Sequence, residues 1–236
     1  MNNVEIRARA LSKVKTKIAN LTAIVMVAFL IDSVLGLFSN LTGSVLDVII
    51  SVIVRVLTSF VAAGLAKVAI QTWREGKAQW SDLFICFKSR RYLLCGLYGG
   101  MIAASFSIVS SAVFMLGVQG PAYILEMILD AAAIICTSYI VFAADLNEKK
   151  NPLDMAKLGM KVLTKNIGRV VRMEINLYLW IAIVYVAFLL FFGLVGGVVG
   201  LPLRLVLFVV MGIIRWAVGG YIVLCEAGLG RTLIKG

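Results

Sequence analysis

The chain alternates long apolar stretches with short polar and basic segments. Six apolar stretches are long enough to cross a bilayer, because a hydrocarbon core of about 30 Å takes roughly 20 apolar residues in a helix. They cover residues 20–38, 45–70, 92–118, 121–144, 175–199 and 202–226. The pattern predicts an all-α integral membrane protein with a single membrane domain over residues 1–236, in which six transmembrane helices are arranged as three hairpins.

A basic amphipathic stretch precedes each predicted hairpin. In residues 1–19 apolar side chains recur at helical spacing while the basic ones fall elsewhere, as is typical of an interfacial helix. The recurring residues are Val4, Ala8, Leu11, Val14 and Ile18. We expect this helix to lie on the cytoplasmic face and to lead into the span at 20–38.

Aromatic residues mark the second basic stretch. Trp80, Phe84 and Phe87 recur on one side of a short predicted helix, and Lys88 follows at its end. Ser81 is a residue type that caps helices at their N-terminus, and we expect it to do so here. Tryptophan favours the headgroup boundary, so this segment is a candidate contact with lipid or with a partner protein.

The third basic stretch carries the clearest helix start. Asn151 is a candidate N-cap, Pro152 suits the first helical position, and Asp154 lies in the first turn. An apolar stripe follows at Leu153, Ala156, Met160, Leu163, Ile167 and Val170. Lysines on the rest of the helix are candidate contacts with lipid or a cytoplasmic partner, and they are Lys157, Lys161 and Lys165.

The placement of the basic residues orients the chain. Of its 236 residues 61% are hydrophobic and 15% charged, and the net charge is +11. Most basic residues fall in the termini and in two of the loops: Arg7, Arg9, Lys13, Lys15, Lys17, Arg74, Lys77, Lys88, Arg90, Arg91, Lys149, Lys150, Lys157, Lys161, Lys165, Arg169, Arg172, Arg231 and Lys235. Because positive loops stay inside, we expect both termini to be cytoplasmic. The charge then indicates anionic lipid headgroups as partners, and not nucleic acid.

The residue types that support most catalysis are scarce. The chain has no histidine, and Cys86, Cys95, Cys136 and Cys225 form no CxxC pair. Without the commonest general base and metal ligand, and without a phosphate-binding loop, we expect no enzyme, no metal site and no cofactor.

Ionisable residues inside the predicted spans are the best candidates for a functional site, because such residues are costly in a bilayer. Those singled out are Asp32, Asp47, Arg55, Glu126, Asp130, Arg204, Arg215 and Glu226. If the inward-running spans adjoin, Arg55 and Arg215 meet Glu126 and Asp130. Two interpretations are open: a structural ion-pair network, or a polar cavity, open outward, for a charged or zwitterionic substrate.

Two stretches of the chain resemble a known family. The first is Gly76–Leu94, GKAQWSDLFICFKSRRYLL, and the second is Tyr139–Leu179, in which a span ends in an Asp and an Asn-Pro turn opens a helix. The chain resembles the bacterial multi-pass membrane proteins catalogued as domain of unknown function 975, which is related to the membrane domain of glycerophosphodiester phosphodiesterases. The resemblance implies the topology and a bacterial cell membrane, and it implies no enzymatic activity.

Three functional classes fit this sequence. The chain is expected to be a transporter component whose cytoplasmic helices couple to an ATPase, or a self-contained carrier that uses the buried charges. In either form it handles a charged or zwitterionic solute or lipid. The alternative is a non-catalytic membrane scaffold that binds lipid or another membrane protein through its basic helices.

Overall fold

Helices form the regular structure of this protein. The computed structural model describes residues 1–37, 45–115, 119–147, 151–177, 179, 183, 186 and 201–235. The labelled helices are α1 (Asn3–Leu37), α2 (Val45–Glu75), α3 (Trp80–Leu83), α4 (Ile85–Lys88), α5 (Arg90–Met115), α6 (Gln119–Leu146), α7 (Pro152–Lys165) and α9 (Leu201–Lys235). Residues 167–177 are also helical. The prediction of an all-α fold is confirmed for the described residues.

Within the described residues, three helices are long and apolar enough to cross a membrane. They are Ile49–Glu75 in α2, Arg90–Val109 in α5 and Ile128–Leu146 in α6. In α1, Ala19–Leu35 is a shorter apolar helix. The predicted spans 45–70, 92–118 and 121–144 therefore fall on helices of membrane-spanning length, whereas most of the predicted span 175–199 lies outside the described residues.

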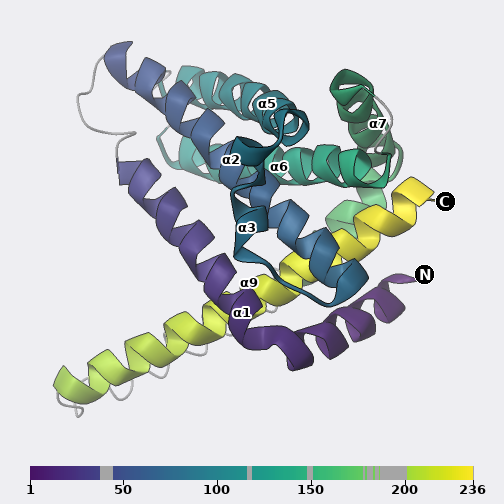
Figure 1. The fold of residues 1–236 in the computed structure, drawn as a ribbon. Coiled ribbons are helices and arrows are strands. Elements are labelled where there is room, and N and C mark those ends of the chain that lie inside the picture. The colour runs from purple at the N-terminus through teal and green to yellow at the C-terminus, as the bar shows by residue number, and fades with distance from the viewer. Residues whose placement is uncertain are drawn as a thin grey trace.

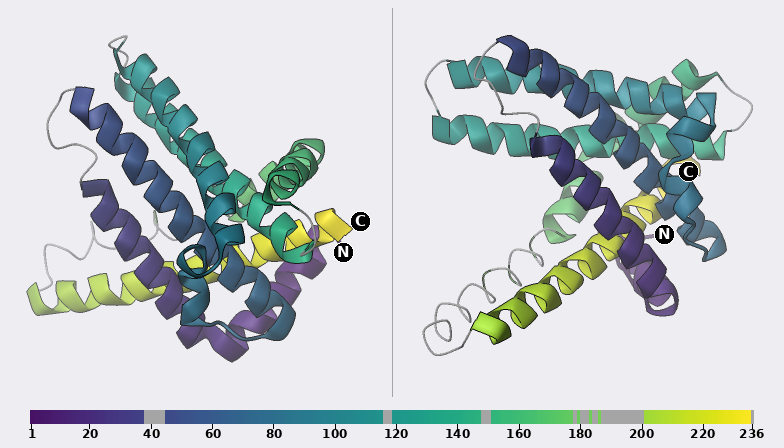
Figure 2. Two further views of the ribbon diagram at one scale, coloured as in Figure 1. Left: turned by 45° about the horizontal axis from the view of Figure 1, so that its top comes forward. Right: turned by 60° about the vertical axis from the view of Figure 1, so that its left-hand side comes forward.

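Helix α2 lies at the centre of the arrangement. It packs against α5 and α6 on one side and against α1 and α9 on the other (Figure 1). The further views in Figure 2 show α5 beside α6 along most of their length and α9 crossing α1. Side chains of α2 can therefore reach both halves of the bundle, which matters for the ion pairs described below.

Helix α1 changes direction along its length (Figure 1). Its start is fixed by a reciprocal capping box, in which Asn2 Oδ1 accepts from the Glu5 amide at 2.8 Å and Glu5 Oε2 accepts from the Asn2 amide at 3.0 Å. Near this start Ile6 is buried, while Val4 and Leu11 from the predicted apolar stripe are exposed. The described part of this stripe therefore faces away from the protein core, as an interfacial helix requires. The side chains of Val14 and Ile18 lie outside the described residues.

The buried core lies toward the end of the bundle that carries α3, α7 and both termini. Trp73, Tyr139 and Phe142 are among its largest fully buried side chains. Glycine makes this packing possible, because a Cβ atom on Gly228 of α9 would stand 2.6 Å from the Trp73 ring. Helices α2 and α9 thus approach at a place where only a residue without a side chain fits.

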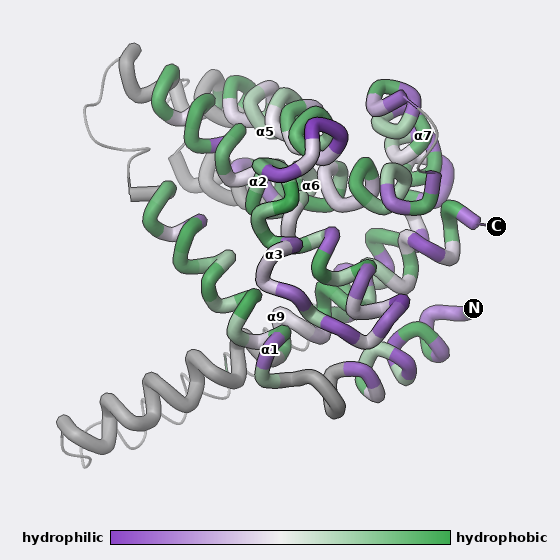
Figure 3. The backbone as a smooth tube through the Cα atoms, in the orientation of Figure 1, coloured by the Kyte–Doolittle hydropathy of each residue, from purple (hydrophilic) through white to green (hydrophobic). Residues whose placement is uncertain are grey.

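Hydrophobic and hydrophilic residues separate along the bundle. Figure 3 shows hydrophilic residues gathered around α3, α7 and both termini, and hydrophobic residues along α2, α5 and the second part of α1. Large apolar side chains on these helices are exposed, among them Leu30, Ile53, Met101 and Ile128. An exposed apolar surface of this kind is expected where a helix contacts lipid.

Candidate functional site

The structure brings together three of the charged residues that the spans contain. Arg55 of α2 reaches Glu126 of α6 with Nη2 at 2.8 Å from Oε1, and Asp130 with Nη1 at 2.6 Å from Oδ1. Glu126 and Asp130 are four residues apart and so share one face of α6. The arginine lies between two carboxylates, so this cluster carries one net negative charge when all three groups are ionised.

A second charged cluster lies nearer the hydrophilic end, and the sequence did not reveal it. Asp145 of α6 accepts from Lys67 at 2.5 Å and from Arg74 at 2.8 Å, both on α2, and its Oδ1 accepts from the Tyr92 hydroxyl at 3.2 Å. Only 2% of the Asp145 side chain is exposed. The sequence does place Lys67 near the end of one predicted span and Asp145 at the end of another. Each of these charges alone is typical of a span end that contacts solvent, so neither predicts the ion pair.

A third contact fixes the same end of α6. Arg91 of α5 donates from Nη2 to the carbonyl oxygens of Ala144 at 2.5 Å and Asn147 at 2.6 Å. These carbonyls lie in and just after the last turn of α6, where no amide of the helix donates to them. A cation at this position also interacts favourably with the helix dipole. Together, Arg91 and the Asp145 cluster hold α2, α5 and α6 in one register.

A cavity of about 300 Å³ lies among α1, α2, α6 and α9. Its walls are mostly apolar, and its polar side chains are two carboxylates and two hydroxyls. These are Asp32 of α1, Glu226 of α9, Thr58 of α2 and Ser138 of α6. The cavity is thus an apolar chamber with acidic groups, set within a chain of strongly positive net charge.

This cavity lies apart from the charged residues at which the sequence predicts a polar cavity. The sequence placed a polar cavity at Arg55, Glu126 and Asp130, but none of the three lines the chamber, whereas Asp32 does. Of the other predicted residues, the side chains of Asp47, Arg204 and Arg215 lie outside the part of the chain that the structure describes.

The aromatic segment forms two single-turn helices, α3 and α4. The expectation that Ser81 caps this helix is wrong, because Gln79 takes the N-cap position without a side-chain hydrogen bond and Ser81 lies inside α3. The three aromatic residues and Lys88 are all exposed: Trp80, Phe84, Phe87 and Lys88. Phe87 is 68% exposed although its ring also packs edge-on against Phe60.

The opposite side of this segment is buried. Leu83 and Cys86 face the core, and the Cys86 thiol donates to the Tyr92 carbonyl at 3.3 Å. Burial raises the pKa of the Cys86 thiol to about 12, so the reactive thiolate is scarce at neutral pH. Burial also raises the pKa of Asp82 in α3. The segment is therefore anchored on its inner side and presents aromatic rings outward.

Helix α7 starts where the sequence predicts. Asn151 accepts from the Leu153 amide at 3.4 Å, and Pro152 is the first helical residue. The apolar side of α7 packs against α6 through Ala156, Leu163 and the close approach of Gly159 to the backbone of Tyr139 and Ile140. This intramolecular contact takes up much of the stripe that the sequence left available for membrane or partner. The lysines remain exposed: Lys157, Lys161 and Lys165.

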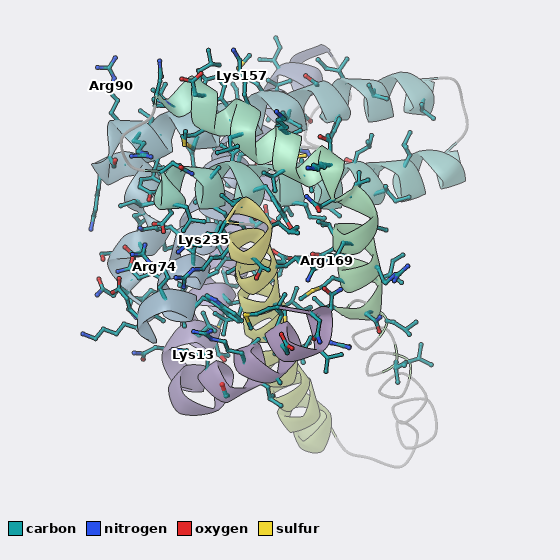
Figure 4. The ribbon with its side chains drawn as sticks, turned by 90° about the vertical axis from the view of Figure 1, so that its right-hand side faces the viewer. Lys13, Arg74, Arg90, Lys157, Arg169 and Lys235 are labelled. Atoms are coloured by element: carbon teal, nitrogen blue, oxygen red, sulfur yellow. The ribbon has the colours of Figure 1, made fainter. Side chains whose placement is uncertain are left out.

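Basic residues from distant parts of the sequence gather at one end of the bundle. Figure 4 looks onto this end and shows basic side chains of α1, α2, α5, α7, the 167–177 segment and α9 distributed over it. Those labelled are Lys13, Arg74, Arg90, Lys157, Arg169 and Lys235. We call this end the basic face.

Comparison with known proteins assigns no function to these residues. The functional interpretation therefore depends on the acidic cavity, the two ion-pair clusters and the basic face. No protein-family model, no curated protein and no solved structure matches this chain.

Proposed function

We propose that this protein is a non-catalytic transport component or transport accessory of the cell membrane that receives a positively charged or zwitterionic amphiphile in its acidic cavity. It crosses the membrane six times as three hairpins, with both termini and the basic face in the cytoplasm. The resemblance to domain of unknown function 975 is part of the same proposal. The observation that carries it is an apolar chamber with two carboxylates, lined by the membrane-length helices α2 and α6 together with α1 and α9.

The topology is supported by the separation of charge from apolar surface. Basic residues of six separate segments lie at one end (Figure 4), and exposed apolar side chains lie along the helices of spanning length. A positively charged end is retained in the cytoplasm and is attracted to anionic headgroups there. The chain thus has a basic end for the cytoplasmic surface and apolar helix surfaces for the lipid, as a bundle inserted in a membrane requires.

A labelling experiment tests this topology. A cysteine introduced at Ser44, in a predicted outer connection, is expected to react with a membrane-impermeant maleimide in intact cells. A cysteine introduced at Lys157, on exposed α7, is expected to react only after permeabilisation. The four native cysteines are buried and give little background. Reaction of both positions in intact cells would show that the orientation is wrong.

The chemistry of the cavity defines its ligand. A chamber of this volume holds a small organic molecule, and its apolar walls favour a hydrophobic body. Asp32 and Glu226 favour a positive charge at the polar part of that molecule, because a nearby cation stabilises the ionised carboxylates. Thr58 and Ser138 add hydroxyls that donate to a polar headgroup or accept from it. An organic cation with an apolar body meets all three conditions.

Binding of benzyltrimethylammonium to the purified chain in nanodiscs tests the proposal. We expect saturable binding to the wild type and about tenfold weaker binding to Asp32→Asn, which corresponds to about 1.4 kcal/mol for one lost charge interaction. Asp154→Asn is the matched control, because Asp154 is an exposed acid on α7. The uncharged isostere neopentylbenzene separates charge from shape. Equal binding of the two compounds contradicts a role for the carboxylates.

A second candidate function is favoured by the aromatic segment. Trp80, Phe84 and Phe87 are exposed beside Lys88, next to the basic face. Aromatic rings with neighbouring cations suit an anionic bilayer surface or the groove of a cytoplasmic partner such as an ATPase. In this alternative the protein is a membrane scaffold, and the cavity serves packing only.

A further inference from the structure

The chain turns back on itself directly after α2. Gly76 adopts a φ of 70°, a conformation that glycine reaches without steric cost, and it lets the chain reverse direction there. The short helices α3 and α4 then pack against α2, and α4 also packs against the start of α5 (Figure 1). We call residues 80–88 the return segment.

Three contacts show how far the return segment reaches along α2. The backbone of Leu83 lies against Gly64, where a Cβ atom on that glycine would overlap the Leu83 carbonyl. Further along, the Cys86 sulfur lies 3.6 Å from the Phe60 carbonyl oxygen, and the rings of Phe87 and Phe60 are 5.9 Å apart. Phe60 lies about 22 Å from the C-terminal end of α2, because an α-helix rises about 1.5 Å per residue. The return segment therefore extends far back along α2.

This depth falls within the apolar part of α2. The helix Ile49–Glu75 is long and apolar enough to cross a membrane, and it carries no charged residue between Arg55 and Lys67. Phe60 lies in this interval, about 10 Å deeper than Lys67 along the helix. A bilayer that surrounds α2 therefore also contacts the outer side of the return segment.

The backbone of the return segment suits such a place. At membrane depth, short helices and turns are tolerated only where protein covers their polar groups. Leu83 and Cys86 are buried on the inner side, against α2 and α5. The Phe87 amide donates to the Phe84 carbonyl at 3.1 Å, so part of the backbone is also paired within the segment.

The outer side of the return segment is aromatic. Trp80 is 44% exposed, Phe84 42% and Phe87 68%. Transfer of these rings from water to hydrocarbon is favourable in proportion to their exposed area. Because the segment runs deeper from Trp80 to Phe87, the tryptophan lies nearer the headgroups, which is the position that this residue type favours.

Two exposed cations follow the rings. Lys88 ends α4 and Arg90 begins α5, and Figure 4 shows the Arg90 side chain extending away from the bundle. Long basic side chains beside apolar surface reach the headgroup region from below it. Cations next to exposed rings match the cytoplasmic leaflet, where anionic phosphates cover acyl chains. A soluble partner fits less well, because the deepest ring lies below the charged boundary at Lys67.

We propose that the return segment is re-entrant. It dips into the cytoplasmic leaflet, places Trp80, Phe84 and Phe87 among the acyl chains, and binds the phosphate of an anionic phospholipid through Lys88 and Arg90. The proposal rests on the proposed topology, which fixes the leaflet, and it is independent of the ligand in the cavity.

Spin labels measure the depth of the segment in the full chain, reconstituted in vesicles of phosphatidylcholine and phosphatidylglycerol. A label on Phe87→Cys is expected to collide more often with oxygen, which concentrates in the bilayer, than with a water-soluble nickel chelate. Met101→Cys, exposed on α5, gives the lipid reference, and Lys157→Cys, exposed on α7, gives the water reference. The four native cysteines are buried and take up little label.

The ratio of the two collision rates decides the proposal. A ratio close to that of Met101→Cys supports insertion, whereas a ratio close to that of Lys157→Cys places the rings in water and overturns it. A label that neither reagent reaches shows that protein covers the rings, which also overturns lipid as the partner. Phe84→Cys replaces Phe87→Cys if that variant does not fold, because Phe84 is exposed too. A wrong topology is detected separately, by the maleimide labelling at Ser44 and Lys157.

Quenching of tryptophan fluorescence by brominated lipids tests the headgroup contact. The difference between the chain and its Trp80→Phe variant isolates this ring, which brominated phosphatidylglycerol is expected to quench more than brominated phosphatidylcholine does. The double variant Lys88→Gln, Arg90→Gln is expected to reduce this preference by about fivefold for each charge removed. Lys161→Gln, Lys165→Gln is the matched control, because both lysines are exposed on α7. The same preference in both double variants overturns the phosphate contact.

Discussion

Replacing Asp145 with alanine is expected to destabilise this protein by about 3–5 kcal/mol. The substitution leaves Lys67, whose side chain is 16% exposed, without the carboxylate that it contacts at 2.5 Å. Arg74 is more exposed and can turn to water, so the cost comes mainly from the lysine and from the Tyr92 hydroxyl. Unfolding of the purified chain, followed by fluorescence-detected size-exclusion after heating, measures this loss.

Two further variants define the cause of that loss. The double variant Lys67→Met, Asp145→Leu removes both partners and is expected to recover most of the stability, because two apolar side chains leave no uncompensated charge. Asp154→Ala removes an exposed acid in the first turn of α7 and is expected to cost at most about 1 kcal/mol. If Asp145→Ala is no worse than Asp154→Ala, the cluster does not hold the helices together.

Replacing Arg55 with leucine is expected to cost about 2 kcal/mol or more. Glu126 and Asp130 then remain four residues apart on one face of α6 with no cation between them. Their mutual repulsion and the cost of charge within a span both oppose insertion and folding. The yield of monodisperse protein and its midpoint of thermal unfolding report this change.

Neutralising Glu126 and Asp130 shows whether the loss of stability comes from repulsion between these acids or from lost packing of the Arg55 side chain. The triple variant Arg55→Leu, Glu126→Gln, Asp130→Asn is expected to regain stability, whereas Arg90→Leu, on the exposed start of α5, is expected to change it by less than about 0.5 kcal/mol. If the triple variant folds and still binds benzyltrimethylammonium, the cluster has a structural role only. Loss of binding with intact folding assigns it to the ligand path instead.

Local patterns in the sequence were sufficient for the helices and for some of their ends. The start of α7 follows from Asn151 and Pro152, because capping depends on residues within one turn of each other. The apolar stretches placed α2, α5 and α6, since burial in lipid needs only length and composition. The four-residue spacing of Glu126 and Asp130 also set both acids on one face of α6.

Short-range signals failed where the chain folds back on itself. Ser81 has the chemistry of an N-cap, but Gln79 takes that position and α3 starts two residues earlier, with Leu83 and Cys86 buried against the core. Packing against α6 takes up the apolar side of α7, a surface that the sequence alone leaves free for membrane or partner. At Ser81 tertiary contacts outweigh a local capping preference of about 1 kcal/mol.

The sequence by itself determined that this chain is helical, which stretches are apolar enough for lipid and which charges lie within them. Only the tertiary structure decided which charges meet, as Lys67 meets Asp145. It also placed Asp32 and Glu226 around one cavity. The physical reason is that helical periodicity fixes the face of a residue on its own helix, whereas the rotation and crossing of neighbouring helices depend on side-chain packing across the whole bundle.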